Sequence, residues 1–225
     1  TSLILPVFNL TLCLAGLAGI GGGALISRLL GKQDLQGVRH ASSFCFYGAI
    51  FTGLVIGLGL LVFRVPMLSL LGANEETFGH ASDYYLYLAI GAPVIVLTYI
   101  HSNLLRAEGM SKESMLGNVV GSVVNIVLDP IFISVLGWDA AGAAIATVIG
   151  NLCADLFFLV VVIRRSKILS VNPREMGIPL NHVGQILGIG VPAAIVNLMS
   201  SASSVLINQF LLPFGNDKIA AMGIA

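Results

Sequence analysis

The sequence has 225 residues, of which 56% are hydrophobic and only 10% are charged, and its formal net charge is zero. A soluble domain usually carries about 25% charged residues, so this composition excludes an ordinary water-soluble protein. The balanced charge also argues against a nucleic-acid partner. We therefore expect an integral membrane protein whose surface lies mostly in lipid.

Stretches with few or no charged residues predict the membrane spans, because a helix needs about 20 apolar residues to cross the hydrocarbon core. None of these stretches shows the alternating ten-residue pattern of a membrane β-strand. The predicted fold class is therefore all-α, a polytopic helical membrane protein with about six transmembrane helices. The expected spans are residues 1–27, 40–63, 84–105, 114–138, 140–163 and about 183–212.

Basic residues are distributed unequally between the two sides of the membrane that these spans define. One side receives nine of them, and the opposite side receives only Arg64 and Lys218. The positive-inside rule places the richer side in the cytoplasm, so a connection containing Glu75, Glu76 and Asp83 is expected to face outward. The basic residues of the richer side are Arg28, Lys32, Arg39, Arg106, Lys112, Arg164, Arg165, Lys167 and Arg174.

Asp129 is one of two carboxylates inside predicted spans, where a charge costs about 2.5–3.5 kcal/mol on insertion scales. Asn125 lies four residues earlier, so the two side chains share a helix face. Pro130 cannot donate a hydrogen bond to the carbonyl group of Ile126, so we expect the helix to bend there. A carboxylate, an amide and a free carbonyl group at one bend predict a small-cation or proton site. The alternative is a neutral Asp129 that bonds Asn125 and only ties helices together.

Asp155 is the second intramembrane carboxylate, and Asn151 precedes it at the same spacing of four residues. It lies nine residues before Arg164, which corresponds to about 13 Å from the cytoplasmic end of the helix. Asp155 and Asn151 are therefore secondary candidates for an ion site. The alternative is a polar contact with a neighbouring helix or with water in an inner vestibule.

The last predicted span has no charged residue but carries polar side chains that either line a cavity or bond between helices. The candidate cavity-lining residues are Asn197, Ser200 and Ser204.

The cysteines and histidines are dispersed along the chain, so they predict neither a disulfide framework nor a zinc site. No convergent set of catalytic groups is visible either, and we expect no enzymatic activity, no cofactor and no metal beyond a sodium ion at Asp129.

Three ordered motifs resemble the multidrug and toxin extrusion (MATE) transporters. They are Leu-Arg-Ala-Glu-Gly at 105–109, Asn-Ile-Val-Leu-Asp-Pro-Ile-Phe-Ile at 125–133 and Gly-Ala-Ala-Ile-Ala-Thr at 142–147. Residues 27–32, Ser-Arg-Leu-Leu-Gly-Lys, are similar to the first cytoplasmic linker of that family. The resemblance runs from end to end and implies a fragment that covers helices two to seven of a twelve-helix, two-lobed transporter.

On this resemblance, residues 1–175 form the amino-terminal lobe without its first helix and end in a cytoplasmic linker between the lobes. Residues 176–225 begin the carboxy-terminal lobe. The first helix, which normally contributes an acidic residue to the cation site of that lobe, is then absent from this sequence.

The resemblance also implies an activity, since the family exports cationic or amphipathic compounds by antiport with protons or sodium. In one prokaryotic branch the cation site uses residues that match Asn125, Asp129 and Thr147. Another branch uses a carboxylate on helix seven, and residues 183–212 contain none. The implied partners are a small-molecule substrate, a proton or sodium ion and membrane lipid, and the implied location is the prokaryotic plasma membrane.

Three alternatives remain open at this point. A related flippase for lipid-linked saccharides or cell-wall precursors would share the helices but should show a more basic central cavity, and no basic residue lies in the middle of a span. A membrane-embedded enzyme would need catalytic groups gathered near one interface. A structural subunit predicts that Asp129 can be replaced without loss of transport by its complex.

Overall fold

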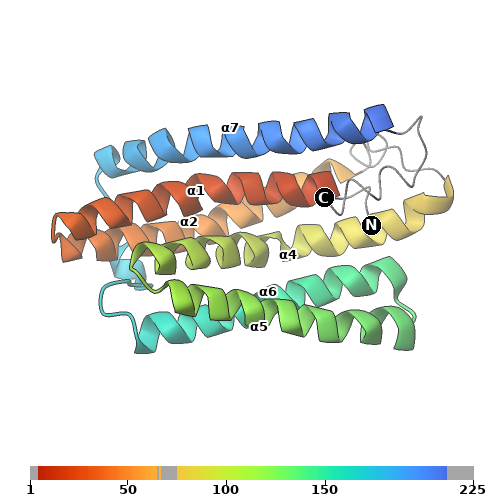
Figure 1. Cartoon of the computed structure of the whole chain (residues 1–225), viewed down its shortest axis with the longest axis horizontal. Helices are drawn as coiled ribbons and strands as arrows, with labels where there is room; N and C mark the ends of the chain where they lie inside the picture. The colour runs from red at the N-terminus through yellow and green to blue at the C-terminus, as the bar shows by residue number, and fades with distance from the viewer. Residues whose placement is uncertain (1–4, 65, 67–74, 212–225) are drawn as a thin grey trace.

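The computed structural model describes residues 5–64, 66 and 75–211 (Figure 1). Within these ranges the chain is almost entirely helical and contains no strand. Six helices are long and apolar enough to cross a membrane, which confirms the predicted fold class. The elements are α1 (Leu5–Gly31), α2 (Leu35–Val62), α4 (Glu75–Ala107), α5 (Ser111–Pro130), the π-helix η2 (Ile131–Val135), α6 (Asp139–Arg164), the 3-10 helix η3 (Pro173–Glu175) and α7 (Leu180–Leu211).

The third span begins earlier than the sequence suggested. We expected Glu75, Glu76 and Asp83 in an outward-facing connection, but α4 starts at Glu75, so this prediction was wrong for their local structure. The reason is length, because the 33 residues of α4 reach about 50 Å, well beyond the roughly 30 Å of the hydrocarbon core. A helix of this length continues outside the core.

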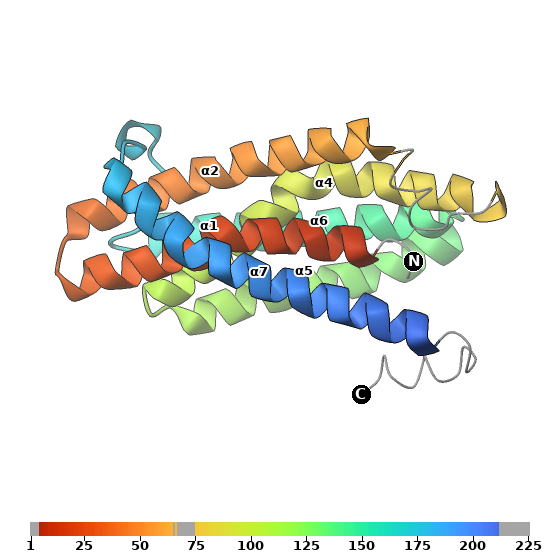
Figure 2. The same ribbon diagram turned by 90° about the horizontal axis from the view of Figure 1, so that it is seen from above.

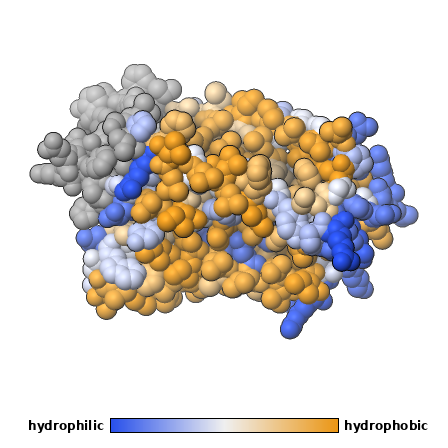
Figure 3. Space-filling view, turned by 180° about the vertical axis from the view of Figure 1, so that it is seen from behind, coloured by the Kyte–Doolittle hydropathy of each residue, from blue (hydrophilic) through white to orange (hydrophobic). Residues whose placement is uncertain are grey.

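Helix α4 occupies the middle of the bundle and contacts α1, α2, α5 and α6 (Figures 1 and 2). Helix α7 packs against α1 and crosses it obliquely in Figure 2. The span of α4 is the most buried of the six in the described structure, and the span of α5 is the least buried. Figure 3 shows a surface that is mostly hydrophobic over the middle of the bundle, with hydrophilic residues towards its ends, as expected for a protein that spans a membrane.

The connections that carry most of the basic residues lie at one end of the bundle. In Figure 1 the α1–α2 turn, the α4–α5 turn and the segment between α6 and α7 share that end. The α6–α7 segment is held against α2, because the hydroxyl groups of Ser42 and Ser43 donate to the carbonyl oxygen of Ser170 at 3.2 and 3.0 Å. Tyr47 donates to the carbonyl oxygen of Val171 at 3.0 Å. The alternation of connections that underlies the predicted topology is therefore present, and the cytoplasmic assignment of this end stays a prediction.

Glu108 anchors the same segment from the α4–α5 turn. The Ser166 hydroxyl donates to Glu108 Oε1 at 2.9 Å, and the same hydroxyl oxygen accepts from the backbone of Leu169. Burial raises the pKa of the Glu108 carboxyl group, and hydrogen bonds from Ser166 and the Lys167 backbone oppose that rise. The linker predicted to separate two lobes is thus packed on the helices before it, while the division of the chain near residue 175 stays a prediction.

Candidate functional site

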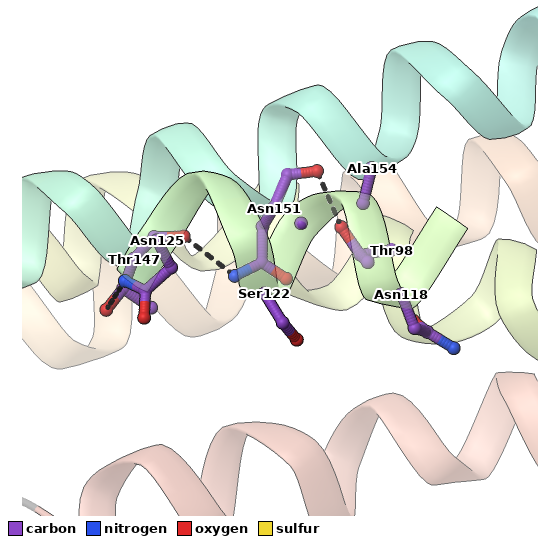
Figure 4. A pocket seen from close by; sticks show the side chains of 8 residues that line it. Thr98, Asn118, Ser122, Asn125, Thr147, Asn151 and Ala154 are labelled. Atoms are coloured by element: carbon purple, nitrogen blue, oxygen red, sulfur yellow. Dashed lines mark hydrogen bonds between the residues drawn. The ribbon is translucent and has the colours of Figure 1, made fainter. Parts of the chain in front are cut away.

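Helix α5 carries a polar stripe in an otherwise apolar span. Its members follow at intervals of four, three and four residues, which places them along one face of the helix. Polar side chains of α4 and α6 face this stripe across a cavity of about 190 Å³. Figure 4 shows the row of side chains, with Asn125 and Thr147 at one end and Thr98 and Ala154 at the other. The stripe consists of Asn118, Ser122, Asn125 and Asp129.

Two glycines bring α5 and α6 together beside this cavity. A Cβ atom on Gly150 would lie 2.7 Å from the carbonyl oxygen of Gly121, and one on Gly121 would lie 2.9 Å from that of Gly150. Only glycine allows such an approach of two backbones, and small residues are the usual means of close helix packing in a membrane. The Asn125 backbone and the α6 residues that face it are thereby held within reach of each other.

The structure brings the predicted cation-site residues together. Asn125 Nδ2 lies 3.5 Å from Asp129 Oδ1 and 3.4 Å from Thr147 Oγ1, so one amide group bridges a carboxyl group on α5 and a hydroxyl group on α6. These are long contacts at the limit of hydrogen-bond geometry. The Thr147 hydroxyl donates to the carbonyl oxygen of Ala143 at 2.9 Å, which leaves its lone pairs for the amide or for an ion. Asp129 itself is half-buried.

The helix changes character immediately after Asp129. The α-helix ends at Pro130 and the π-helix η2 begins at Ile131, so the structure shows a change of helix type at the proline where the sequence predicted a bend, and the bend itself stays a prediction. Such π segments occur frequently at functional sites. The side chain of Tyr84 on α4 lies within electrostatic range of Asp129, a neighbour that the sequence could not reveal because it depends on the packing of α4 against α5.

Asp155 and Asn151 do not act as a pair. The Asn151 amide donates to the carbonyl oxygen of Thr147 at 2.8 Å and lines the cavity, whereas Asp155 turns towards α4 and contacts His101 Nδ1 at 3.2 Å. His101 had no role in the sequence analysis, because it is 54 residues from its partner. No local spacing could have indicated this contact.

With this geometry established, comparison with known proteins identifies the family. Residues 1–131 match the family model described as MatE. The chain belongs to the MatE family. The resemblance stated from the three sequence motifs is therefore confirmed.

One curated relative of this MatE chain is the multidrug export protein MepA of Staphylococcus aureus (strain NCTC 8325 / PS 47). It is 36% identical over 224 residues, a match that covers 100% of this chain and 50% of the relative. The chain thus spans about half the length of the curated relatives it matches.

Solved MATE structures in two conformations are also similar to the MatE chain. One is described as the inward-facing conformation of a multidrug resistance MATE family transporter of the MOP superfamily; it has a TM-score of 0.86 and 30% identity, over 92% of this chain and 47% of that structure. The other is described as the outward-facing conformation of such a transporter, with a TM-score of 0.83 and 30% identity, over 94% of this chain and 46% of that structure. The helix arrangement described above therefore matches relatives in both conformations.

The polar residues of α7 occupy a different part of the MatE chain. A Cβ atom on Gly16 of α1 would lie 3.8 Å from Asn197 Nδ2, so Asn197 faces α1 and is not among the residues that line the α5–α6 cavity. The side chains of Ser200 and Ser204 lie outside the described residues. The cavity-lining role of these three residues stays a prediction.

The donor set at Asp129 suits a small hard cation or a proton. It offers a carboxylate oxygen and a hydroxyl oxygen, with the Asn125 amide nitrogen turned towards both, beside an irregular helix. In the part of the MatE chain that the structure describes, no three His, Cys, Asp or Glu side chains lie close enough to hold a metal ion.

Proposed function

We propose that the chain forms helices two to seven of a cation-coupled antiporter that exports cationic or amphipathic small molecules by alternating access. The observation that carries this proposal is the bridged group of Asp129, Asn125 and Thr147 beside a polar cavity inside the membrane-spanning bundle. The printed name of its relative, a multidrug export protein, supports the substrate class. The bacterial source of that relative supports a location in the prokaryotic plasma membrane.

The coupling step is an exchange of charge at Asp129. When a proton or a sodium ion binds, the carboxylate loses or neutralises its charge, and its contact with the Asn125 amide is weakened or replaced. The bridge from α5 to Thr147 on α6 then has a different energy, which changes the preferred packing of the two helices. Substrate must favour the opposite state, because equal affinity for both states would shift no equilibrium.

The chemistry of the cavity favours an exporter of cations over a flippase for lipid-linked saccharides. Phosphate groups of such lipids are usually held by Arg or Lys side chains. The cavity beside Asp129 is lined by neutral side chains, chiefly Asn, Ser and Thr, and by no basic residue. A neutral polar wall next to one carboxylate matches a cationic ligand better than an anionic one.

The proposed organisation follows the family's two-lobed plan. Residues 1–175 form most of the amino-terminal lobe, and residues 176–225 begin the carboxy-terminal lobe. Substrate passes between the lobes, which rock about the fixed coupling site in the first of them.

The test uses the full-length protein that contains this sequence, reconstituted in proteoliposomes. We would follow uptake of a fluorescent cationic dye under an imposed pH gradient and then under a sodium gradient. We expect gradient-driven uptake in the wild type. In Asp129→Asn the rate of that uptake should fall by about tenfold or more, and a tenfold change corresponds to about 1.4 kcal/mol. The matched control is Asp139→Asn, an exposed carboxylate at the start of α6 with φ of 43°, a conformation that Asn adopts readily.

Coupled uptake that persists unchanged in Asp129→Asn would contradict the assigned site. Absence of dye movement under both gradients, together with movement of a lipid-linked saccharide, would favour the flippase.

A further inference from the structure

A second ionisable group lies inside the bundle, and the mechanism above does not use it. His101 on α4 and Asp155 on α6 are 3% and 6% exposed, and their Nδ1 and Oδ1 atoms are 3.2 Å apart. Both residues lie within candidate membrane spans. They join the most buried helix of the bundle to the helix that carries Thr147.

The pair is incompletely satisfied by hydrogen bonds. His101 Nε2 and Asp155 Oδ2 are buried and have no hydrogen-bond partner among the described residues. Buried polar atoms are nearly always bonded, so two unpartnered atoms on one contact require an explanation, and proton exchange or contact with water supplies one.

The surroundings insulate the pair from other charges. The His101 ring lies 5.2 Å from the ring of Phe46 on α2 and 6.2 Å from that of Phe158 on α6. Among the described residues, His101 is the only charged or titratable group that interacts with Asp155. Tyr47, the residue after Phe46 on α2, donates its hydroxyl to the carbonyl oxygen of Val171.

The other neighbours of the pair are neutral and polar. Next to His101, the Ser102 hydroxyl bonds Ser114 and accepts from Asn118 of α5, each at 2.9 Å. The Thr98 hydroxyl faces the Asp155 carboxyl group. No charged side chain of α5 therefore reaches the pair in the described structure.

The cavity of the coupling site ends at residues that neighbour this pair. One end of its lining consists of Asn125 and Thr147, and the other end includes Thr98 and Ala154, the residue before Asp155 (Figure 4). Between them the Thr98 hydroxyl contacts the carbonyl oxygen of Asn151 at 3.2 Å. The eight residues from Thr147 to Asp155 correspond to about 12 Å along α6, in the direction of the basic end of the bundle.

We propose that His101 and Asp155 form a second proton-binding site, which lies between the coupling cavity and the basic end of the bundle. One proton that arrives from the side of higher proton concentration converts the carboxylate and neutral imidazole into a carboxylate and imidazolium pair. The same proton leaves to water at the basic end when the pair is exposed to the side of lower proton concentration. The role of this exchange in transport rests on the proposed function, whereas the binding of the proton does not.

The first experiment observes the proton directly, in the full-length protein in lipid nanodiscs. His40, His80 and His182 are replaced by Gln, together with any histidine in the rest of the full-length protein. His101 then carries the only imidazole of that protein. Its 15N resonances are then followed between about pH 5 and pH 8, where an imidazole changes charge. We expect a reversible titration in this background and in the same background with Asp129→Asn. Adding Asp155→Asn should lower the protonated fraction of His101 at a given pH by about tenfold, because the counter-charge is lost.

The second experiment measures the pH profile of dye transport in wild type, Asp155→Asn and His101→Gln. A shifted profile in both variants supports the proposal, since a merely structural role would lower the rate equally at every pH. A folded protein in which His101 keeps one protonation state over the whole range overturns the proposal. Should Asp155→Asn fail to fold, the titration of the single-histidine protein still decides. Failure of the proposed function is recognised separately, by coupled transport that survives in Asp129→Asn.

Discussion

The two intramembrane carboxyl groups of this chain look alike in sequence and differ in structure. Each follows an asparagine by four residues in an apolar span. Asp129 is half-buried beside an open polar cavity and contacts the neutral amide group of Asn125, which in turn contacts Thr147 of α6. Asp155 is buried and contacts an ionisable partner on α4. The difference teaches that the helix opposite a carboxyl group decides its chemistry more than its own sequence context does.

The contrast follows from the burial of the helices concerned. Helix α5 has the least buried span in the described structure, and Asp129 on it is half-buried. Asp155 lies on the face of α6 that packs against α4, the most buried span. Removal from solvent makes the charge of Asp155 depend on one specific partner, whereas Asp129 is less removed from solvent.

The largest expected effect comes from removing each carboxyl group and measuring thermal unfolding in detergent. Asp155→Ala leaves His101 without its partner in a buried site, so we expect a loss of about 3 kcal/mol in the free energy of unfolding. Asp129→Ala removes only long contacts and should cost less than about 1 kcal/mol.

The conservative variant Asp155→Asn serves as the control, because it keeps the shape and a hydrogen bond and should fall between these values. Equal losses of unfolding free energy in Asp155→Ala and Asp129→Ala would contradict the proposed difference between the two carboxyl groups.

An intermediate effect is expected where α5 and α6 touch beside the cavity. In Gly150→Ala the new methyl group would meet the carbonyl oxygen of Gly121 and Cβ of Asn125, so the helices must separate. We expect a loss of about 2 kcal/mol in unfolding free energy and a weaker response of transport to the ion gradient. The matched control is Gly48→Ala on α2, where no atom lies within 4 Å of the added Cβ.

If Gly150→Ala alters the Asp129-dependent coupling while the protonation of His101 is unchanged, the two regions are separable. A variant that unfolds no more easily than Gly48→Ala would show that the α5–α6 contact is not tight.

The smallest expected effect concerns Glu108, which extends the comparison to a carboxyl group at the membrane surface. Because burial raises its pKa above the ordinary 4.5, the folded protein binds this proton more tightly than the unfolded chain does. The resulting stabilisation is complete below about pH 4.5 and is lost as pH rises through the folded-state pKa. Partial exposure limits it to less than about 1 kcal/mol.

The measurement compares thermal unfolding of wild type and Glu108→Gln from about pH 4.5 to about pH 7.5. The variant should lose the pH-dependent part of stability that wild type shows. Glu113→Gln, which removes the half-buried partner of the exposed Arg165, should keep it. A wild-type protein whose stability rises over this range relative to Glu108→Gln would contradict the sign of the shift.

Several features were determined by the sequence alone. Charge-free runs predicted six spans because the requirement for apolar length in a membrane is local to each segment. The i and i+4 spacing predicted the contact between Asn125 and Asp129, and the proline predicted an irregular helix after them, since both depend on the geometry of one helix. The family motif then pointed to Thr147, 22 residues away from Asn125, a contact that spacing could not have indicated.

The remaining features were decided only by the tertiary structure. The pairing of His101 with Asp155, the contact of Thr98 with the carbonyl oxygen of Asn151 and the docking of Ser170 on α2 join residues of different helices or distant segments. Sequence periodicity predicts which residues share a face of a helix, but not the rotation and axial register of one helix against another. Those two quantities are set by the packing of small and large side chains over the whole bundle, and they determine which polar groups meet inside the membrane.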